Sequence, residues 1–379
     1  MKALRNFVDN WYDSHKDRIF ERTKDDPEVA HESFVKLARA IHKLGLEKLL
    51  LNCPENASNP GFEISNAAGF NKNGEIPPTF LKYLGFDRVV VGTVTADAWD
   101  GNPRPRIKRY SETNSLVNWM GLPGVGAERV ADNLISHGNH SVPITINLMA
   151  TPGKQGDELL RDLEKTVLVT RGLRNVDRYE LNISCPNTHG SLGKIDAREE
   201  YFGLLGEMLR VMKSNMDSVF YELWVKISPD TSMGEVKSTI DILKEYGVDG
   251  LTVGNTTREH DPRYVIFPAN NKGTNGESIG GASGNAVYRK VRRVQNRVHE
   301  LIGERQVYST ENLEIWSDTE RKEVITSEGD MKIIAVGGIN SAERAIERTY
   351  NGNNTVKGIQ IFTPLIFSGP KLLRQLRTL

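Results

Sequence analysis

Residues 179–188 read YELNISCPNT, a short apolar run that ends at a proline. Residues 179–183 have the composition of a buried β-strand, and Pro186 ends it because proline cannot donate a hydrogen bond to a neighbouring strand. Cys185 therefore follows the carboxyl end of the strand, where catalytic side chains are common. Taken by itself, Cys185 has a second interpretation, a buried structural cysteine beside a turn.

Seven more short apolar runs accompany this one, so the chain predicts eight strands. They are expected at 64–68, 88–92, 143–147, 179–183, 223–227, 249–253, 332–336 and 358–362. Most of these runs lack alternation of apolar and polar residues, as expected for parallel strands that are covered on both faces. Helical patterns lie between them at 157–171, 199–212, 233–246, 285–301 and 341–350.

Strands that alternate with helices in this number indicate an α/β fold, a (β/α)8 TIM barrel. A doubly wound parallel sheet is the alternative, and the count of eight favours the barrel. Residues suited to binding or catalysis cluster at the carboxyl ends of the strands, which is the face on which barrel enzymes build their active sites. These residues are Lys72, Thr93, Asn147, Cys185, Lys226, Asn255 and Gly337.

The composition excludes several classes of protein. The 379 residues carry 49 Lys and Arg against 49 Asp and Glu, so a nucleic-acid partner is not expected. The two cysteines, Cys53 and Cys185, have no metal-binding spacing and cannot form a disulfide framework. No apolar stretch approaches the length of a membrane span, and no signal peptide is visible. The expected location is the cytoplasm, with peripheral contact to the inner face of a membrane as a further option.

Residues 1–57 are expected to form an N-terminal helical extension, and residues 58–379 the barrel, with a charged insertion at about 299–330. Six apolar residues of the extension recur at three- and four-residue spacing, which predicts an amphipathic helix: Leu4, Phe7, Val8, Trp11, Tyr12 and Ile19. The extension either packs on the barrel as a helical pair or forms a hood that contacts a membrane and admits an apolar substrate. A long connection at 93–142 is expected to cover the barrel mouth.

Glycines in the loops after the last two strands predict a phosphate site. Gly338 follows the strand at 332–336, and Thr363 follows the strand at 358–362. Backbone N–H groups in such loops can approach a phosphate, and barrel enzymes commonly bind phosphate there. Gly284 is a candidate for a third contact. Lys226 lies in an apolar strand, where it either reaches solvent or faces the negative charge of a reduced flavin.

A series of ordered motifs from Asp26 to the C-terminus resembles the dihydroorotate dehydrogenases, flavin-dependent enzymes of pyrimidine synthesis. The motifs are AAGFNKNGE at 67–75, GTVT at 92–95, NWMG at 118–121, NISCPNT at 182–188, NTT at 255–257, GGASG at 280–284 and GGI at 337–339. The resemblance implies a barrel that binds FMN and oxidises dihydroorotate to orotate in de novo UMP synthesis.

The resemblance also implies a role for each matching residue. Cys185 would be the base that removes a proton from C5 of dihydroorotate, while C6 passes a hydride to N5 of FMN. The substrate would be held by Lys72, Asn118, Asn182, Asn187, Asn255 and Thr256. The cofactor would be held by Ala68, Gly69, Thr93, Asn147, Asn182, Lys226, Gly284, Gly338 and Thr363. No metal is implied.

The chain combines features of two subclasses. Residues 26–32, DPEVAHE, and the helical N-terminus resemble the membrane-associated, quinone-reducing class. Cys185 is typical of the soluble class, since the quinone class normally has serine there. Asn71 and Gly254 also depart from the common pattern, which has an acidic residue and a threonine. We expect a quinone as electron acceptor, and a soluble acceptor such as fumarate is the alternative.

Three other functions remain open from the sequence. An NAD-linked form of the same reaction would need an iron–sulfur cluster on another chain. A barrel flavoprotein that reduces uridine in tRNA, similar to the dihydrouridine synthases, would need a basic surface that the zero net charge does not supply. A flavin-binding scaffold without catalysis would have no use for Cys185 and the nearby amides.

Overall fold

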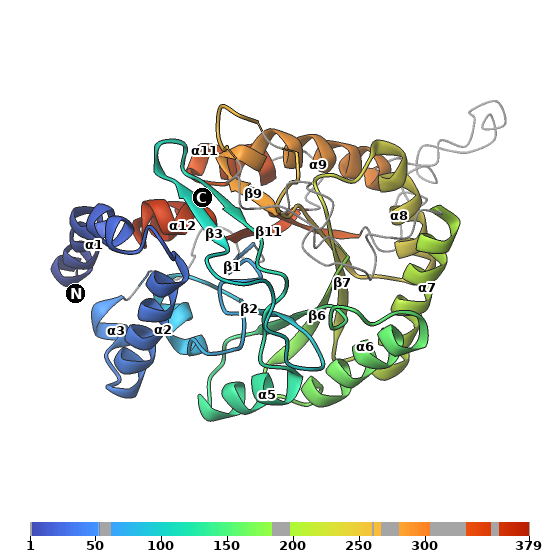
Figure 1. The fold of residues 1–379 in the computed structure, drawn as a ribbon. Coiled ribbons are helices and arrows are strands. Elements are labelled where there is room, and N and C mark those ends of the chain that lie inside the picture. Colours follow the sequence, from blue (N-terminus) through green and yellow to red (C-terminus); the bar gives the residue numbers. More distant parts are fainter. Residues whose placement is uncertain are drawn as a thin grey trace, which may run out of the picture.

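A computed structural model describes residues 2–51, 53, 62–183, 198–259, 261–266, 280–303, 331–349 and 356–378. Its eight-stranded parallel sheet runs in the order β1-β11-β10-β8-β7-β6-β5-β2. Parallel bridges from Ser65 to Arg88 and from Asn71 to Val91 join the two ends of this sheet. The result is a barrel surrounded by helices (Figure 1), so the predicted (β/α)8 fold is confirmed and the doubly wound sheet is excluded.

Each barrel strand overlaps one of the predicted apolar runs. The strands are β1 Glu63–Asn66, β2 Val89–Val94, β5 Ile144–Leu148, β6 Val176–Asn182, β7 Glu222–Ile227, β8 Gly250–Val253, β10 Lys332–Val336 and β11 Val356–Ile361. The flanking helices are α4 Pro78–Leu84, α5 Ala127–Ser136, α6 Gly156–Thr170, α7 Arg198–Asn215, α8 Met233–Glu245, α9 Tyr288–Gly303, α11 Ala342–Thr349, α12 Thr363–Ser368 and α13 Lys371–Leu376. Residues 304–330 of the predicted insertion lie outside the described residues.

Strand β6 shows how the two faces of the barrel wall differ. Tyr179 and Leu181 are fully buried in the apolar layer between strands and helices, and Tyr179 Oη lies 3.1 Å from Thr170 Oγ1 of α6. The alternate residues Arg178, Glu180 and Asn182 contact polar side chains of other barrel strands. The barrel interior is therefore polar here, whereas Val, Ile and Leu usually fill it.

Ion pairs between strands occupy the amino-terminal end of the barrel interior. Glu63 accepts from Arg88 Nε at 3.0 Å and from Arg178 Nη1 at 2.6 Å. Glu222 accepts from Arg178 Nε at 3.0 Å and pairs with Lys332 Nζ at 2.5 Å. We call these five residues the basal ion-pair network. Because they come from five different strands or strand ends, they hold the barrel closed at its base.

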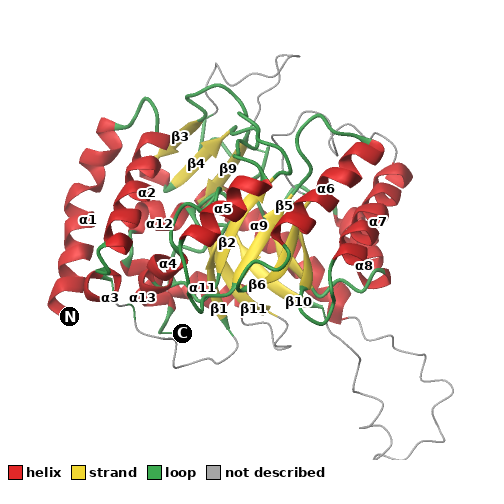
Figure 2. Cartoon of the chain, turned by 90° about the horizontal axis from the view of Figure 1, so that it is seen from below, coloured by secondary structure: helices red, strands yellow, loops and turns green. Residues whose placement is uncertain are grey.

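A three-stranded antiparallel sheet is added to the barrel. It consists of β3 Ile107–Tyr110, β4 Ser115–Asn118 and β9 Gly281–Gly284, in the order β3-β4-β9. In Figure 2 this sheet lies beyond one end of the barrel strands. The long connection 93–142 thus contributes two strands that the sequence patterns did not predict, because their sequences, IKRY and SLVN, contain no apolar run longer than two residues.

Three helices precede the barrel: α1 Lys2–Arg22, α2 Glu28–Lys43 and α3 Glu47–Leu50, grouped on one side of it (Figure 1). Side-chain pairs tie them to the barrel domain. Asp13 pairs with Lys371 of α13 at 2.5 Å, and Glu28 accepts from Arg106 Nε at 2.8 Å in a buried pair. Within the described part of the chain, no helix is both long and apolar enough to cross a membrane.

Candidate functional site

The structure describes most of the predicted site residues, and they lie at or beyond the carboxyl ends of the barrel strands. Asn182 ends β6, Gly338 follows β10 and Thr363 follows β11. Cys185 and Asn187 are exceptions, because they lie outside the described residues. The roles predicted for these two residues remain predictions.

The three residues predicted to hold a phosphate come together from three loops. A Cβ atom built on Gly338 would lie 2.9 Å from the carbonyl oxygen of Gly284, and one built on Gly284 would lie 2.9 Å from Thr363 Cγ2. Both glycines have left-handed φ angles, +76° for Gly284 and +69° for Gly338, which other residues rarely adopt. Ser283 Oγ lies 2.9 Å from Thr363 Oγ1. A side chain at either glycine would collide with neighbouring atoms, so the close approach of these loops requires glycine at both positions.

A second group of residues forms a polar network inside the barrel around Glu180. The Glu180 carboxylate accepts hydrogen bonds from Asn147 Nδ2 at 2.6 Å, from Gln360 Nε2 at 3.0 Å and from the Thr252 hydroxyl. Lys226 Nζ donates to Gln360 Oε1 at 3.5 Å. We call these five buried residues the Glu180 network. They come from β5, β6, β7, β8 and β11.

The Glu180 network joins two predicted cofactor residues, Asn147 and Lys226, to three that the sequence analysis missed. A signal for the missed residues was available, since Glu180 and Gln360 are polar residues inside apolar runs, as Lys226 is. What the sequence could not reveal is that they contact one another across the barrel. Thr252 had no such signal, because threonine is common in strands.

The amide orientation of Asn147 leaves one atom without a partner. Its side chain is completely buried, and its Nδ2 must face Glu180 because a carboxylate can only accept hydrogen bonds. Among the described residues, no hydrogen-bond partner reaches Asn147 Oδ1. A buried acceptor of this kind is suited to an N–H group of a bound molecule.

Asn182 and Thr93 form a third contact at the same end of the barrel. Asn182 Nδ2 donates to Thr93 Oγ1 at 3.0 Å, and both side chains are buried. Gly69 N donates to the carbonyl oxygen of Gly92 at 2.7 Å, which ties the loop after β1, including Ala68, to the end of β2. The predicted cofactor residues of β1, β2 and β6 are thereby brought to one end of the barrel.

Lys72, a predicted substrate ligand, follows β1 in a half-buried position. Burial lowers the pKa of Lys72 to about 8, the Glu28 carboxylate acts in the opposite direction, and Arg106 lowers the pKa further. Lys72 is therefore still mostly charged at neutral pH. Burial also lowers the pKa of the neighbouring His31 to about 4, helped by the charge of Lys72, so His31 is neutral there.

The remaining predicted substrate residues lie on either side of β9. Asn118 ends β4, pairs in register with Gly281 and donates from Nδ2 to its carbonyl oxygen at 3.5 Å. Asn255 and Thr256 follow β8, and the next residue, Thr257, pairs with Ala282 of β9. Strand β9 therefore lies between Asn118 and Thr257, the residue that follows the Asn255–Thr256 loop.

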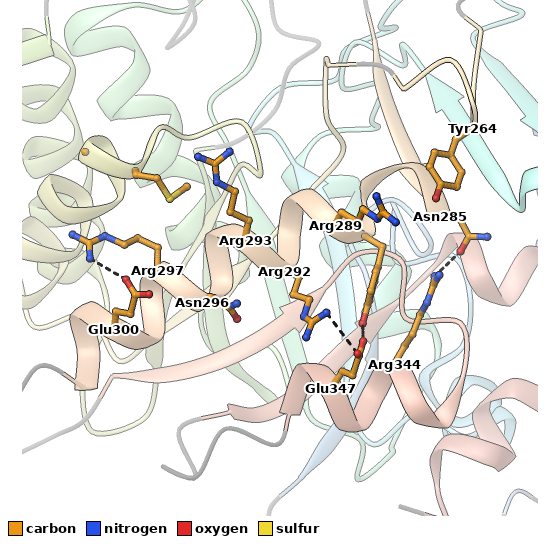
Figure 3. Close-up of a pocket in the computed structure, with 13 residues that line it drawn as sticks. Tyr264, Asn285, Arg289, Arg292, Arg293, Asn296, Arg297, Glu300, Arg344 and Glu347 are labelled. Carbon is orange, nitrogen blue, oxygen red and sulfur yellow. Dashed lines mark hydrogen bonds and ion pairs between the residues drawn. The ribbon is translucent and has the colours of Figure 1, made fainter.

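Figure 3 shows a different cavity, of about 1070 Å³, along the outer side of α9. Two of its five arginines pair with its two glutamates: Arg292 Nη1 lies 3.6 Å from Glu347 Oε1, and Arg297 Nη1 lies 3.0 Å from Glu300 Oε2. None of the predicted site residues lines this cavity. It adjoins the candidate site, because Arg344 Nη1 of its lining donates to the carbonyl oxygen of Gly338 at 2.9 Å.

Comparison with known proteins identifies a family. A family model described as Dihydroorotate dehydrogenase matches residues 55–307. Relatives named "Dihydroorotate dehydrogenase (quinone)" include proteins from Natronomonas pharaonis, 30% identical over 82% of this chain and 75% of theirs, and Chelativorans sp., 31% identical over 92% and 85%.

Solved structures show the same fold. Ligand-free DHODH from Eimeria tenella matches with a TM-score of 0.68 at 23% identity and covers 93% of both chains. The complex of DHODH from the same organism with ferulenol matches with a TM-score of 0.66 at 22% identity, over 93% of this chain and 90% of that chain.

Proposed function

This chain belongs to the dihydroorotate dehydrogenase family, and we propose that it oxidises dihydroorotate to orotate with a bound FMN. The reaction belongs to pyrimidine synthesis. One observation carries the proposal: the predicted phosphate residues and the predicted ring residues, spread over most of the chain, assemble at the same end of the barrel.

The described residues fit an FMN in two places. Gly284 and Gly338 lie close to each other, and Gly284 lies close to Thr363, so two loop backbones and one hydroxyl that could bind a phosphate are brought together. Asn147 Oδ1 offers a buried acceptor, and the imide of the flavin ring carries one N–H donor. Lys226 supplies a buried cation on the same network. When bound, FMN supplies the acceptor for the hydride that leaves C6 of dihydroorotate.

The chain itself has to position the substrate and remove the other hydrogen. In our proposal Cys185 takes the proton from C5 onto Sγ, and the electron pair of that C–H bond forms the C5=C6 double bond of orotate. Lys72 faces the substrate carboxylate with its positive charge. The ring is held by amides and a hydroxyl, which match its donors and acceptors: Asn118, Asn182, Asn187, Asn255 and Thr256.

An anaerobic experiment tests this proposal directly. Purified protein that carries its yellow cofactor is mixed with dihydroorotate, and we expect rapid loss of the flavin absorbance. Orotate, the product, is the control, because it has no hydride to donate and should leave the absorbance near its starting value. Persistence of the colour with dihydroorotate, while FMN is demonstrably bound, would contradict the proposed reaction.

We also propose that a quinone is the electron acceptor and that the N-terminal helices receive it at a membrane surface. Apolar side chains on these helices are exposed to solvent, among them Phe7 at 62% and Leu44 at 69%. Trp11 is exposed on the same helix as Phe7. The Asp13–Lys371 pair holds α1 against α13, and the buried Glu28–Arg106 pair holds α2 against the loop before β3, so the exposed apolar residues of both helices have a fixed place relative to the barrel.

Replacing Phe7 and Trp11 with serine is expected to raise the KM for a quinone at least tenfold without slowing flavin reduction by dihydroorotate. The matched control is serine at Val219 and Phe220, which are 82% and 68% exposed in the turn before β7. This control should leave both half-reactions unchanged. The assignment of the acceptor would be overturned if both double variants raised the KM for a quinone equally. It would also be overturned if the parent protein turned over with fumarate and not with a quinone.

A further inference from the structure

Glu180 is a buried carboxylate at a position where a barrel usually places an aliphatic side chain. Only 1% of the residue is exposed, and both carboxylate oxygens accept hydrogen bonds, Oε1 from Asn147 and Oε2 from Thr252 and Gln360. Burial of a carboxylate is costly, and apolar residues of similar volume often stabilise a fold as well or better. Stability of the barrel alone therefore does not account for this residue.

The carboxylate determines how two amide side chains are oriented. Since Glu180 can only accept, Asn147 and Gln360 must both turn their NH2 groups toward it. Their oxygens are consequently available elsewhere: Gln360 Oε1 accepts from Lys226 Nζ, and Asn147 Oδ1 is left for a donor outside the described residues. A neutral amide at position 180 would permit the Asn147 amide to rotate, whereas Lys226, which can only donate, would still orient Gln360.

The network also places a negative charge near a positive one. Lys226 and Glu180 are both buried, and Gln360 bridges them with one hydrogen bond to each. In surroundings of low polarity, charges act over longer distances than in water. The charge on Glu180 therefore offsets part of the field that Lys226 exerts on a bound cofactor.

We propose that Glu180 is a positioning residue of the FMN site, which fixes the amides of Asn147 and Gln360 and lowers the reduction potential of the flavin by balancing Lys226. This inference rests on the proposed function. Glu180 acts through other residues. Its negative charge disfavours the extra negative charge of reduced flavin, and the Asn147 acceptor that it holds in place favours binding of the ring.

Glu180→Gln tests the proposal, because it removes the charge and keeps the shape. We expect the midpoint potential of the bound FMN to shift to a more positive value, and the Kd for FMN to rise about tenfold through loss of amide orientation. Thr252→Val provides the opposite change. It removes one donor and keeps the carboxylate, so the charge is less neutralised and the potential should shift to a more negative value.

Ser65→Ala is the matched control for the loss of a buried polar group in the barrel wall, since Ser65 Oγ donates to the carbonyl oxygen of Ile359 at 3.3 Å. Its flavin potential should equal that of the parent. Shifts of the same sign in the Glu180 and Thr252 variants would indicate a general disturbance and overturn the proposal, as would an unchanged potential in Glu180→Gln. If Glu180→Gln does not fold, Thr252→Val tests the proposal alone: a shift of the flavin potential to a more negative value supports it, and a positive shift or none overturns it.

The parent protein separates this inference from the proposed function. A parent that binds no FMN overturns both. A parent that binds FMN and is bleached by dihydroorotate, together with variants whose potentials equal that of the parent, overturns only the role of Glu180.

Discussion

Replacement of Cys185 by alanine is expected to slow the reduction of bound FMN by dihydroorotate about 10³-fold, while FMN stays bound. The C5 proton must leave as the double bond forms, and alanine has no group to accept it. A cysteine thiol, with an ordinary pKa near 8.5, needs only modest help to act as a base near neutral pH. The measurement is anaerobic stopped-flow absorbance after mixing with dihydroorotate.

The chain offers a matched control for this experiment, because it has one other cysteine. Cys53 lies beside α4, where its backbone N–H donates to the carbonyl oxygen of Tyr83 at 3.0 Å, and Cys53→Ala should reduce at the parental rate. Cys185→Ser should retain part of the rate and need a higher pH, because a hydroxyl gives up its proton less readily than a thiol. Parental kinetics in Cys185→Ala would show that the base is another residue.

Loss of Arg178 is expected to have the largest effect on stability. Arg178 pairs with Glu63 and Glu222, and its guanidinium also stacks over the Trp224 ring with 4.2 Å to the centroid. Arg178→Met would leave both carboxylates short of a partner inside the barrel. Breaking a buried ion pair from one side costs about 3–5 kcal/mol, and because Glu63 keeps Arg88 and Glu222 keeps Lys332, we expect a loss near the lower end of that range in the free energy of unfolding.

This loss should depend on pH in a defined direction. Burial raises the pKa of Glu222, but the hydrogen bond from Lys332 and the charge of Arg178 lower it more, to about 2 from the ordinary 4.5. A carboxyl whose pKa is lowered by folding stabilises the protein above its ordinary pKa and loses that contribution as the pH falls. The difference in the free energy of unfolding between the parent and Arg178→Met should therefore be largest above about pH 5 and decrease as the pH falls toward 2.

Urea denaturation curves at several pH values measure both effects. Arg263→Met is the control, since Arg263 pairs with Asp261 on the surface and most of its side chain is exposed. Such pairs contribute about 0–1 kcal/mol, so this variant should unfold close to the parent. A loss in Arg178→Met no larger than that of the control, or one that does not change with pH, would mean that the basal ion-pair network does not hold the barrel closed.

The barrel strands could be predicted because their signal is local. Residues 332–336 and 223–227, for example, are apolar runs bounded by polar or glycine-rich segments, and β10 and β7 lie at 332–336 and 222–227. The sheet of β3, β4 and β9 escaped prediction for the opposite reason. Its strands, IKRY, SLVN and GASG, contain no apolar run longer than two residues, and β4 pairs with β9 from Ser115 to Gly284, far apart in the sequence.

The sequence allowed site residues to be proposed one by one but gave no sign of how they assemble. Asn147 and Lys226 were chosen because they lie near the carboxyl ends of apolar runs, yet nothing local to either showed that Glu180 and Gln360 connect them. That connection needs β5, β6, β7 and β11 to face one interior, which depends on closure of the barrel. The same holds for Gly284 and Gly338, whose close approach comes from two distant loops.

The amino-acid sequence by itself determined the class of fold and the family, because apolar periodicity and ordered motifs are properties of short segments. Only the tertiary structure decided that the barrel interior is polar and which charges meet there. Glu63 contacts Arg178 and Glu180 contacts Gln360 across the barrel, over more than 100 residues of chain in each case. Such contacts arise from where the backbone places each strand, and no pattern within a single strand encodes its partner.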